Sequence, residues 1–334
     1  MRVNMIERER LTSLIKLAGL VGASMGAASG LVACAGVVAT KSMPNRTPAR
    51  FVTYDAFPSA HVAARKVVVW LPPDYDASSD RCAVLYMHDG QNLFDAATAM
   101  GGQTWGVAEH LTNLQATGKI RKTIVVGIAN TSARWREYAP AAAVRPLSSP
   151  LRSMLSRVPG EGMEELLSDK YLQFIVDELK PFVDANFRTK PGRDDTFVMG
   201  SSMGGLISLY ALATYPKVFG GAGCVSTHWP IATNPNLLTP SVDPRVAGVA
   251  ASYVNWLEQH LPVAGEHRVY FDHGSINLDS LYAPYQKNFD ALMLRKAYRL
   301  NKDWMTQVFS GADHNEKSWR ERLHLPLQFL LRPD

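Results

Sequence analysis

The sequence predicts an α/β fold in which helices cover both faces of a mostly parallel central β-sheet. Short apolar runs of strand length alternate along the chain with longer segments of helical periodicity, and this alternation is typical of parallel sheets. Charged residues make up 19% of the chain and hydrophobic residues 46%, as in globular proteins. The 334 residues suit one large domain, and no internal repeat or second domain is visible.

Each expected element follows from its apolar pattern and its turn residues. The runs expected to form strands are Val67–Leu71, Ala83–Met87, Thr123–Ile128, Thr196–Met199, Gly221–Val225, Val269–Phe271 and Met305–Phe309. The segments expected to form helices are Gly106–Gln115, Met163–Asn186, Gly204–Tyr215, Arg245–His260, Leu281–Leu300 and Glu316–Leu331.

The N-terminus has the layout of a secretory signal, because a positively charged start precedes an apolar stretch of small residues from Leu17 to Ala39. We therefore expect a signal peptide at residues 1–39, a flexible linker at 40–49 and the folded domain at 50–334. The expected destination is the bacterial periplasm, the cell envelope or the outside of the cell.

The cysteines refine this picture. Leu31-Val32-Ala33-Cys34 resembles a bacterial lipobox, so residues 1–33 would be a lipoprotein signal and Cys34 a lipidated membrane tether. Plain cleavage nearby and an uncleaved anchor helix stay open as alternatives. Cys82 and Cys224 lie in or beside expected strands that are not neighbours, so we expect free buried thiols.

Between Asn130 and Gly162 the periodic pattern lapses, which predicts a structureless loop insertion at about 130–162. It follows an expected strand and should lie above the carboxyl ends of the strands, where open α/β sheets bind ligands. A lid or binding loop is the favoured interpretation, and a disordered surface insertion is the alternative. Arg134 and Arg136 on this loop are candidates to bind a carboxylate or sugar hydroxyls, unless they are solvated surface arginines.

The segment from Phe197 to Gly205 contains the pattern G-x-S-x-G between a strand-like and a helix-like run. This pattern is the nucleophile elbow of α/β-hydrolases, a strained turn that exposes a serine. Gly200 and Gly204 lack a Cβ atom, so strand and helix can pack closely around the serine. The register makes Ser202 the candidate nucleophile.

A serine hydroxyl needs a positioned base. His314 is the candidate because it follows the last expected strand, in agreement with the hydrolase order Ser…Asp/Glu…His. Asn315 or Asp313 can cap the helix that begins near Glu316. Asp272 and Asp279 both follow the preceding strand, and we prefer Asp279 as the acid because it lies beyond the turn.

The developing oxyanion needs hydrogen-bond donors. We expect the backbone N–H of Met203, directly after the nucleophile, and that of Gln91, in the loop where Gly90 allows a tight turn. His88 in the same loop is expected to be structural.

With these residues the chain resembles the esterase D-like family of α/β-hydrolases, which includes enterochelin, feruloyl and acetyl-xylan esterases, S-formylglutathione hydrolases and mycolyltransferases. The resemblance implies a Ser202–Asp279–His314 triad and covers about residues 60 to 331. The longer Gly-rich loop of the formylglutathione hydrolases is missing, which disfavours a glutathione thioesterase. The matching segments are Leu85 to Asp95, Val126 to Asn130 with Arg134 to Tyr138, Met199 to Leu206, Tyr270 to Tyr282 and Gly311 to Trp319.

The predicted function is that of an exported serine esterase acting on a small-molecule or carbohydrate-linked ester through an acyl-enzyme. An acyltransferase that uses a sugar or lipid acceptor, and a catalytically silent surface binding lipoprotein, are the alternatives. Trp105 and Trp229 could line an acyl or aromatic slot or serve as core packing. No pattern predicts a metal, a cofactor or a nucleic-acid partner, since paired histidines, a phosphate-binding glycine loop and a Lys/Arg-rich run are all missing.

Overall fold

In a computed structural model of the chain, residues 47–149, 152, 155, 165–232 and 244–333 can be described. The expected signal, Cys34 and most of the linker lie outside these residues, as does the middle of the expected 130–162 insertion. The chain divides into Met1–Pro44 and Asn45–Asp334, and everything described below belongs to the second unit. Among its described residues, no helix is long and apolar enough to cross a lipid bilayer.

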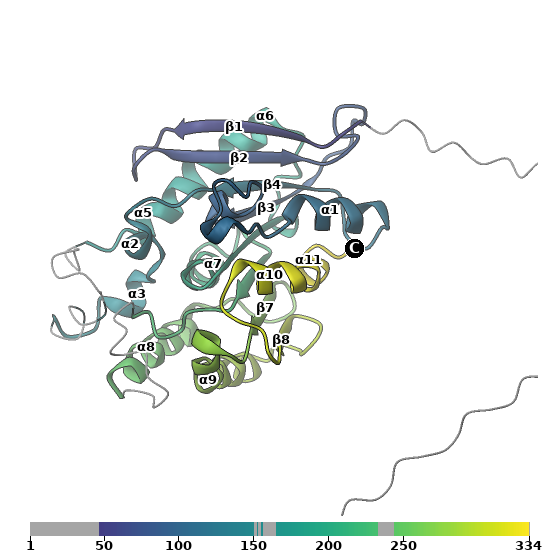
Figure 1. Cartoon of the computed structure of the whole chain (residues 1–334). Helices are drawn as coiled ribbons and strands as arrows, with labels where there is room; N and C mark the ends of the chain where they lie inside the picture. The colour runs from purple at the N-terminus through teal and green to yellow at the C-terminus, as the bar shows by residue number, and fades with distance from the viewer. Residues whose placement is uncertain (1–46, 150–151, 153–154, 156–164, 233–243, 334) are drawn as a thin grey trace, which may run out of the picture. The chain divides into compact units, whose positions relative to one another are not determined.

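The core of this unit is an eight-stranded sheet with the order β1-β2-β4-β3-β5-β6-β7-β8 (Figure 1). The first two strands pair antiparallel, β2 also pairs antiparallel with β4, and all other pairs are parallel. This confirms the predicted α/β class. The strands are β1 Arg50–Phe57, β2 Arg65–Leu71, β3 Ala83–His88, β4 Thr123–Ile128, β5 Thr196–Ser201, β6 Gly221–Val225, β7 Arg268–His273 and β8 Trp304–Val308.

All seven expected strands form, with bounds no more than two residues from the expected ones, and β1 is the strand that the pattern missed. It lies at the sheet edge, and most of its side chains are exposed or half-buried, as far as Phe57. A strand without a buried face has no alternating apolar pattern to detect.

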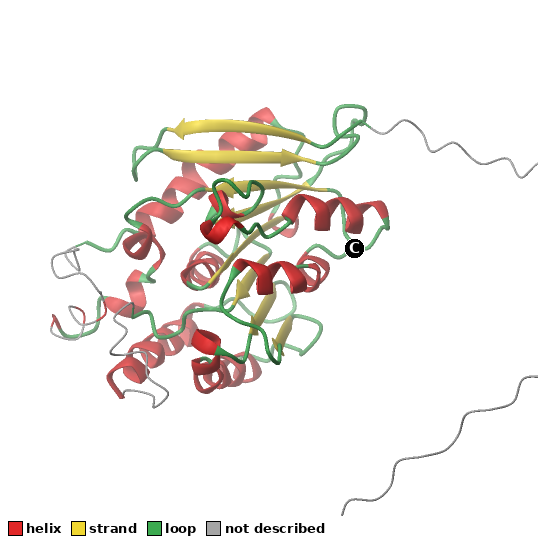
Figure 2. Ribbon diagram, in the orientation of Figure 1, coloured by secondary structure: helices red, strands yellow, loops and turns green. Residues whose placement is uncertain are grey.

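Helices cover both faces of the sheet (Figure 2). Alternate residues of each strand point to opposite faces, so Val84 and Tyr86 of β3 join one apolar cluster and Leu85 and Met87 join the other. The first cluster includes residues of α5, α6, α7, α8 and α9, and the second includes residues of α1, α10 and α11. The helices are α1 Val107–Ala116, α2 Arg134–Tyr138, α3 Ala141–Val144, α5 Ser168–Gln173, α6 Lys180–Asn186, α7 Met203–Thr214, α8 Pro244–His260, α9 Ala283–Arg295, α10 Glu316–Arg322 and α11 His324–Leu330, with the π-helical segment η3 Phe174–Leu179 between α5 and α6.

The expectation of a structureless 130–162 segment was wrong at its start, because α2 and α3 lie there. Tyr138 and Val144 are buried against the main core, and Glu137 forms an ion pair with Arg65 of β2 in which both side chains are 1% exposed. Helices this short carry too few turns to show a period, so their position depends on these tertiary contacts.

Two smaller corrections concern helix ends. The helix expected from Glu316 to Leu331 is two helices, α10 and α11, and the one expected from Leu281 to Leu300 ends at Arg295. The expected cap is confirmed, since the Asn315 side chain accepts a hydrogen bond from the Ser318 N–H at 3.0 Å. Cys82 and Cys224 are buried free thiols, also as expected.

Candidate active site

Ser202 occupies a strained turn between β5, which ends at Ser201, and α7, which begins at Met203. Its backbone has φ 57° and ψ −122°, a conformation that costs a non-glycine residue free energy and that persists only where neighbours enforce it. The loop after β6 does so: the Ser202 N–H donates to Val225 O at 2.9 Å, and its carbonyl accepts from the His228 N–H at 3.1 Å. The turn therefore has the form that the G-x-S-x-G pattern predicts.

Glycines make this turn sterically possible. A Cβ atom on Gly200 would lie 2.9 Å from the backbone carbon of Gly204, and one on Gly205 would lie 2.4 Å from the hydroxyl of Thr227. Neither contact is compatible with a side chain. Strand, turn and helix thus approach each other as closely as the motif requires.

His314 and Asp279 come together although they lie on different loops. His314 Nδ1 and Asp279 Oδ1 are 2.6 Å apart, the Asp279 side chain is fully buried, and that of His314 is 13% exposed. Burial alone would raise the pKa of Asp279, but the hydrogen bonds from His314, Ser226 and the Gly274 N–H outweigh it and lower that pKa. Asp279 is therefore held as an ionised partner of the imidazole.

Asp272, the alternative acid, has different partners. It forms a hydrogen-bonded ion pair with Arg322 and also accepts from the Tyr270 hydroxyl. Burial raises the pKa of Asp272, and Arg322 opposes that rise. No hydrogen bond between Asp272 and His314 is among the contacts of the described residues.

The two expected oxyanion donors lie at the starts of helices, where backbone N–H groups lack partners within the helix. Met203 is the first residue of α7, and Gln91 is central in the 3-10 turn η1, Gly90–Asn92. Gly90 lets this turn rest on β4, because a Cβ there would lie 2.6 Å from the backbone of Gly127.

The turn η1 is also tied to the histidine loop. Asn92 Nδ2 donates to Glu316 Oε1 at 3.2 Å, and Glu316 follows His314 by two residues. Burial raises the pKa of Glu316.

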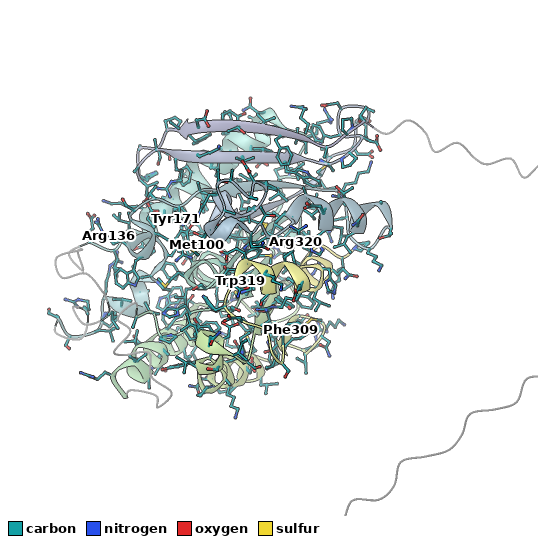
Figure 3. All side chains as sticks on the ribbon, viewed as in Figure 1. Met100, Arg136, Tyr171, Phe309, Trp319 and Arg320 are labelled. Atoms are coloured by element: carbon teal, nitrogen blue, oxygen red, sulfur yellow. The ribbon has the colours of Figure 1, made fainter. Side chains whose placement is uncertain are left out.

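Asp89 is a site residue that pattern reading missed. It has φ 55° and its carboxylate receives two hydrogen bonds from Arg134, at 2.8 and 2.7 Å, and one from Asn130 at 2.6 Å. A Cβ on Gly204 would lie 3.6 Å from Asp89 Oδ2, so this carboxylate borders the serine turn. The two arginines expected to meet substrate have protein partners: Arg134 pairs with Asp89, and Arg136 donates to the Glu165 carbonyl. Arg136, which is labelled in Figure 3, is half-buried.

The expected pocket tryptophans are both buried. Trp105 is 2% exposed and packs at 5.4 Å from Trp319 of α10. Trp229 is 1% exposed, stacks on Phe289 at 3.6 Å and donates to the Gln286 side chain. These are the contacts of packing residues.

Among the described residues, no cluster of three or more His, Cys, Asp or Glu side chains could hold a metal.

Known proteins resemble this chain in sequence and in fold. The sequence profile of the esterase family, described as "Putative esterase", matches residues 62–329. The "Uncharacterized protein YbbA" of Bacillus subtilis (strain 168) is 27% identical over 173 residues, which are 51% of this chain and 60% of that protein, so the match spans less than two thirds of the relative.

Solved structures share the fold at low sequence identity. A ferulic acid esterase superposes with a TM-score of 0.58 at 18% identity, over 85% of this chain and 98% of the other. The enterobactin esterase FES from Shigella flexneri gives 0.57 at 18% identity, over 85% of this chain and 59% of that longer chain. An IroE-like serine hydrolase from Shewanella oneidensis gives 0.56 at 20% identity, over 84% and 80%.

The profile match covers most of the domain, and the superpositions show an α/β-hydrolase architecture throughout it. The chain therefore belongs to the esterase family.

Proposed function

We propose that the chain hydrolyses carboxylic esters through an acyl-enzyme formed on Ser202, with His314 as general base and Asp279 as the acid that orients it. Two observations carry this proposal: the 2.6 Å contact between His314 Nδ1 and Asp279 Oδ1, and the elbow conformation of Ser202. An ionised carboxylate can only accept, so Nδ1 holds the proton and Nε2 is the nitrogen free to act as a base.

The reaction then has two halves. The Ser202 hydroxyl oxygen attacks the ester carbonyl carbon while its proton passes to His314 Nε2, and the imidazolium returns that proton to the departing alkoxide. Water repeats the sequence on the acyl-enzyme: its proton goes to His314, its oxygen bonds to the acyl carbon, and Ser202 leaves with the proton. Asp279 stabilises the imidazolium in both halves without being protonated.

The negative oxygen of each tetrahedral intermediate requires donors. We assign this role to the backbone N–H groups of Met203 and Gln91, because Met203 begins α7 directly after the nucleophile and Gln91 lies in the helical turn η1. The rigid contact between Gly90 and Gly127 supports a fixed position for Gln91.

The substrate is a small-molecule or carbohydrate-linked ester in this proposal. Two of the structural neighbours are a ferulic acid esterase and an enterobactin esterase, and those activities belong to the neighbours. A panel of acetyl, feruloyl and siderophore-type esters would identify the acyl group, and product analysis with an added sugar acceptor would separate hydrolysis from acyl transfer.

The decisive test replaces Ser202 and its neighbour Ser201 separately. Ser202→Ala should lower kcat for p-nitrophenyl acetate by about a thousandfold or more, since it removes the nucleophile. Ser201→Ala is the matched control: Ser201 ends β5 and is 4% exposed, so it should keep wild-type turnover and fluorophosphonate labelling. Wild-type turnover in a folded Ser202→Ala protein would refute the proposal.

A further inference from the structure

A buried network of polar side chains lies behind Asp279, on the side away from His314. Ser226, directly after β6, has its hydroxyl within hydrogen-bond distance of three side chains: Asp279 Oδ2 at 2.6 Å, Arg322 Nη2 at 2.7 Å and Trp319 Nε1 at 3.0 Å. Arginine and indole nitrogens can only donate, so they occupy both acceptor positions of the hydroxyl. The single Ser226 proton must therefore point at Asp279.

Asp272 holds the arginine of this network in place. Arg322 Nε donates to Asp272 Oδ2 at 3.2 Å and Nη2 to Oδ1 at 3.1 Å, in a forked pair with both side chains nearly or fully buried. Tyr270 and the Ser226 N–H complete the Asp272 contacts, and the guanidinium carbon lies 5.0 Å from the centre of the Phe309 ring. The arginine therefore has one orientation, set by β7.

One short helix connects the network to the base. Trp319 and Arg322 are three residues apart on α10 and so share a face of it. The ring of Trp319 packs edge-on against that of His314, with ring centres 5.1 Å apart. Figure 3 labels Trp319 and Phe309. With both carboxylates ionised and Arg322 charged, the cluster carries one net negative charge until His314 takes a proton. Imidazolium formation during catalysis would neutralise it.

We propose that Ser226, Arg322 and Asp272 are positioning residues: they hold the Asp279 carboxylate in one orientation and set the local charge against which His314 is protonated. The proposal rests on the proposed role of Ser202, His314 and Asp279. Asp272, which the sequence pattern offers as the alternative acid, thus acts on Asp279 indirectly, through Ser226 and Arg322. Other titratable groups near the Asp279–His314 pair include Glu316 of α10, Tyr282 after η6 (Asn277–Leu281) and His228 after β6. The Asp313 carboxylate also lies close, because it accepts a hydrogen bond from the His314 N–H at 2.7 Å.

The first test removes the Ser226 hydroxyl. In Ser226→Ala, kcat should fall about 10- to 100-fold, because the Asp279 carboxylate loses a hydrogen bond that holds it. KM should not change, because Ser226 does not line the substrate site in this proposal. Ser226 has φ 40°, which suits glycine, so Ser226→Gly removes the hydroxyl without backbone strain and should show the same fall. Ser280→Ala is the control, since that exposed hydroxyl on η6 donates to the Asn277 carbonyl and should keep wild-type kcat.

The second test uses the pH profile of kcat/KM to measure how the charge of Asp272 affects protonation of His314. Asp272→Asn removes a negative charge near the imidazolium and destabilises it, so the pH of half-maximal activity on the acidic side should move down by about one unit. Asp303→Asn is the control, because Asp303 is 4% exposed and paired with Arg299. None of the hydrogen bonds or ion pairs found among the described residues joins Asp303 to Ser226 or Asp279. This control should leave the acidic limb where it is in the wild type.

The outcomes separate this inference from the proposed function. If folded Ser226→Ala and Ser226→Gly keep wild-type kcat, or if Asp303→Asn moves the acidic limb as far as Asp272→Asn does, the network is structural and the inference is wrong. If Ser202→Ala keeps its turnover, the proposed function fails whatever these variants show.

Discussion

At the scale of single residues, two histidines next to the candidate site are kept neutral by burial. His88 is 1% exposed, its Nδ1 lies 2.8 Å from the Tyr171 hydroxyl, and burial lowers its pKa to about 3. His228 lies between the Tyr282 hydroxyl and the Ala232 carbonyl, and burial lowers its pKa to about 4. Both nitrogens of His228 are therefore engaged in holding the loop that clamps Ser202.

These two shifts predict how stability depends on pH. Below about pH 6.5 the unfolded chain binds a proton at each histidine and the folded chain does not, until the pH falls to about 4 for His228 and about 3 for His88. The free energy of unfolding should therefore fall by about 1.4 kcal/mol per pH unit for each histidine as the pH drops through that range.

Urea unfolding of the His88→Gln variant between pH 6.5 and pH 4 checks this expectation. Glutamine is uncharged at every pH, so the variant should lose about 1.4 kcal/mol per pH unit of the slope, whatever its absolute stability. An equal slope in His88→Gln and wild type would show that His88 is not neutral in the folded state.

At the scale of elements, the site depends on how closely the loops after β7 and β8 approach each other. The Ser275 N–H donates to the Ala312 carbonyl at 3.0 Å, the Gly311 N–H donates to Ser275 Oγ at 2.8 Å, and Asn277 Nδ2 donates to Asp313 at 2.9 Å. These bonds fix the loop that carries His314 against the one that carries Asp279.

Gly274 is the residue on which this approach depends. A Cβ at Gly274 would lie 2.1 Å from the Ala312 oxygen, so Gly274→Ala must push the two loops apart. We expect a loss of about 1–3 kcal/mol in the free energy of unfolding and at least about a tenfold fall in kcat/KM, because the base loses its geometry.

Gly192→Ala is the matched control for this substitution. A Cβ at Gly192 would meet nothing within 4 Å, and its φ of −70° is open to alanine. That variant should be as active as wild type and within about 1 kcal/mol of its stability. Equal activity in the two alanine variants, measured by steady-state hydrolysis, would mean that the loops do not need this contact.

The element pattern was most predictable where strands are buried on both faces. All residues of β3, β4, β5 and β6 are buried, so each reads as a continuous apolar run, and each was predicted. The edge strand β1 and the short helices α2 and α3 lack such a run, and they form because other parts of the chain pack on them.

At the scale of the whole molecule, the esterase fold belongs to the unit from Asn45 to Asp334. We expect a protein that begins at residue 45 to unfold in one cooperative transition and to keep wild-type kcat/KM, since β1 begins only at Arg50. A second truncation that begins at residue 58 removes β1, exposes the edge of β2 and uncovers the core around Phe57, which is 7% exposed. It should unfold at a clearly lower temperature. If the first truncation is also unstable, the preceding segment contributes to the fold.

The sequence by itself determined the α/β class, the seven strands from β2 to β8 and the serine at the centre of the elbow. Each of these depends on local chemistry: an apolar run, a glycine that cannot be replaced, or a cap such as Asn315, whose bond to Ser318 spans only three residues. Such features depend on residues that lie within a few positions of one another in the sequence.

The sequence favoured Asp279 as the partner of His314, but only the tertiary structure decided that Asp272 pairs with Arg322 and that both meet Asp279 through Ser226. His314 is 35 residues from Asp279 and Arg322 is 50 from Asp272. The pairing follows from where the loops after β7 and β8 and the face of α10 converge in space. No local pattern records a contact between side chains that distant in the chain.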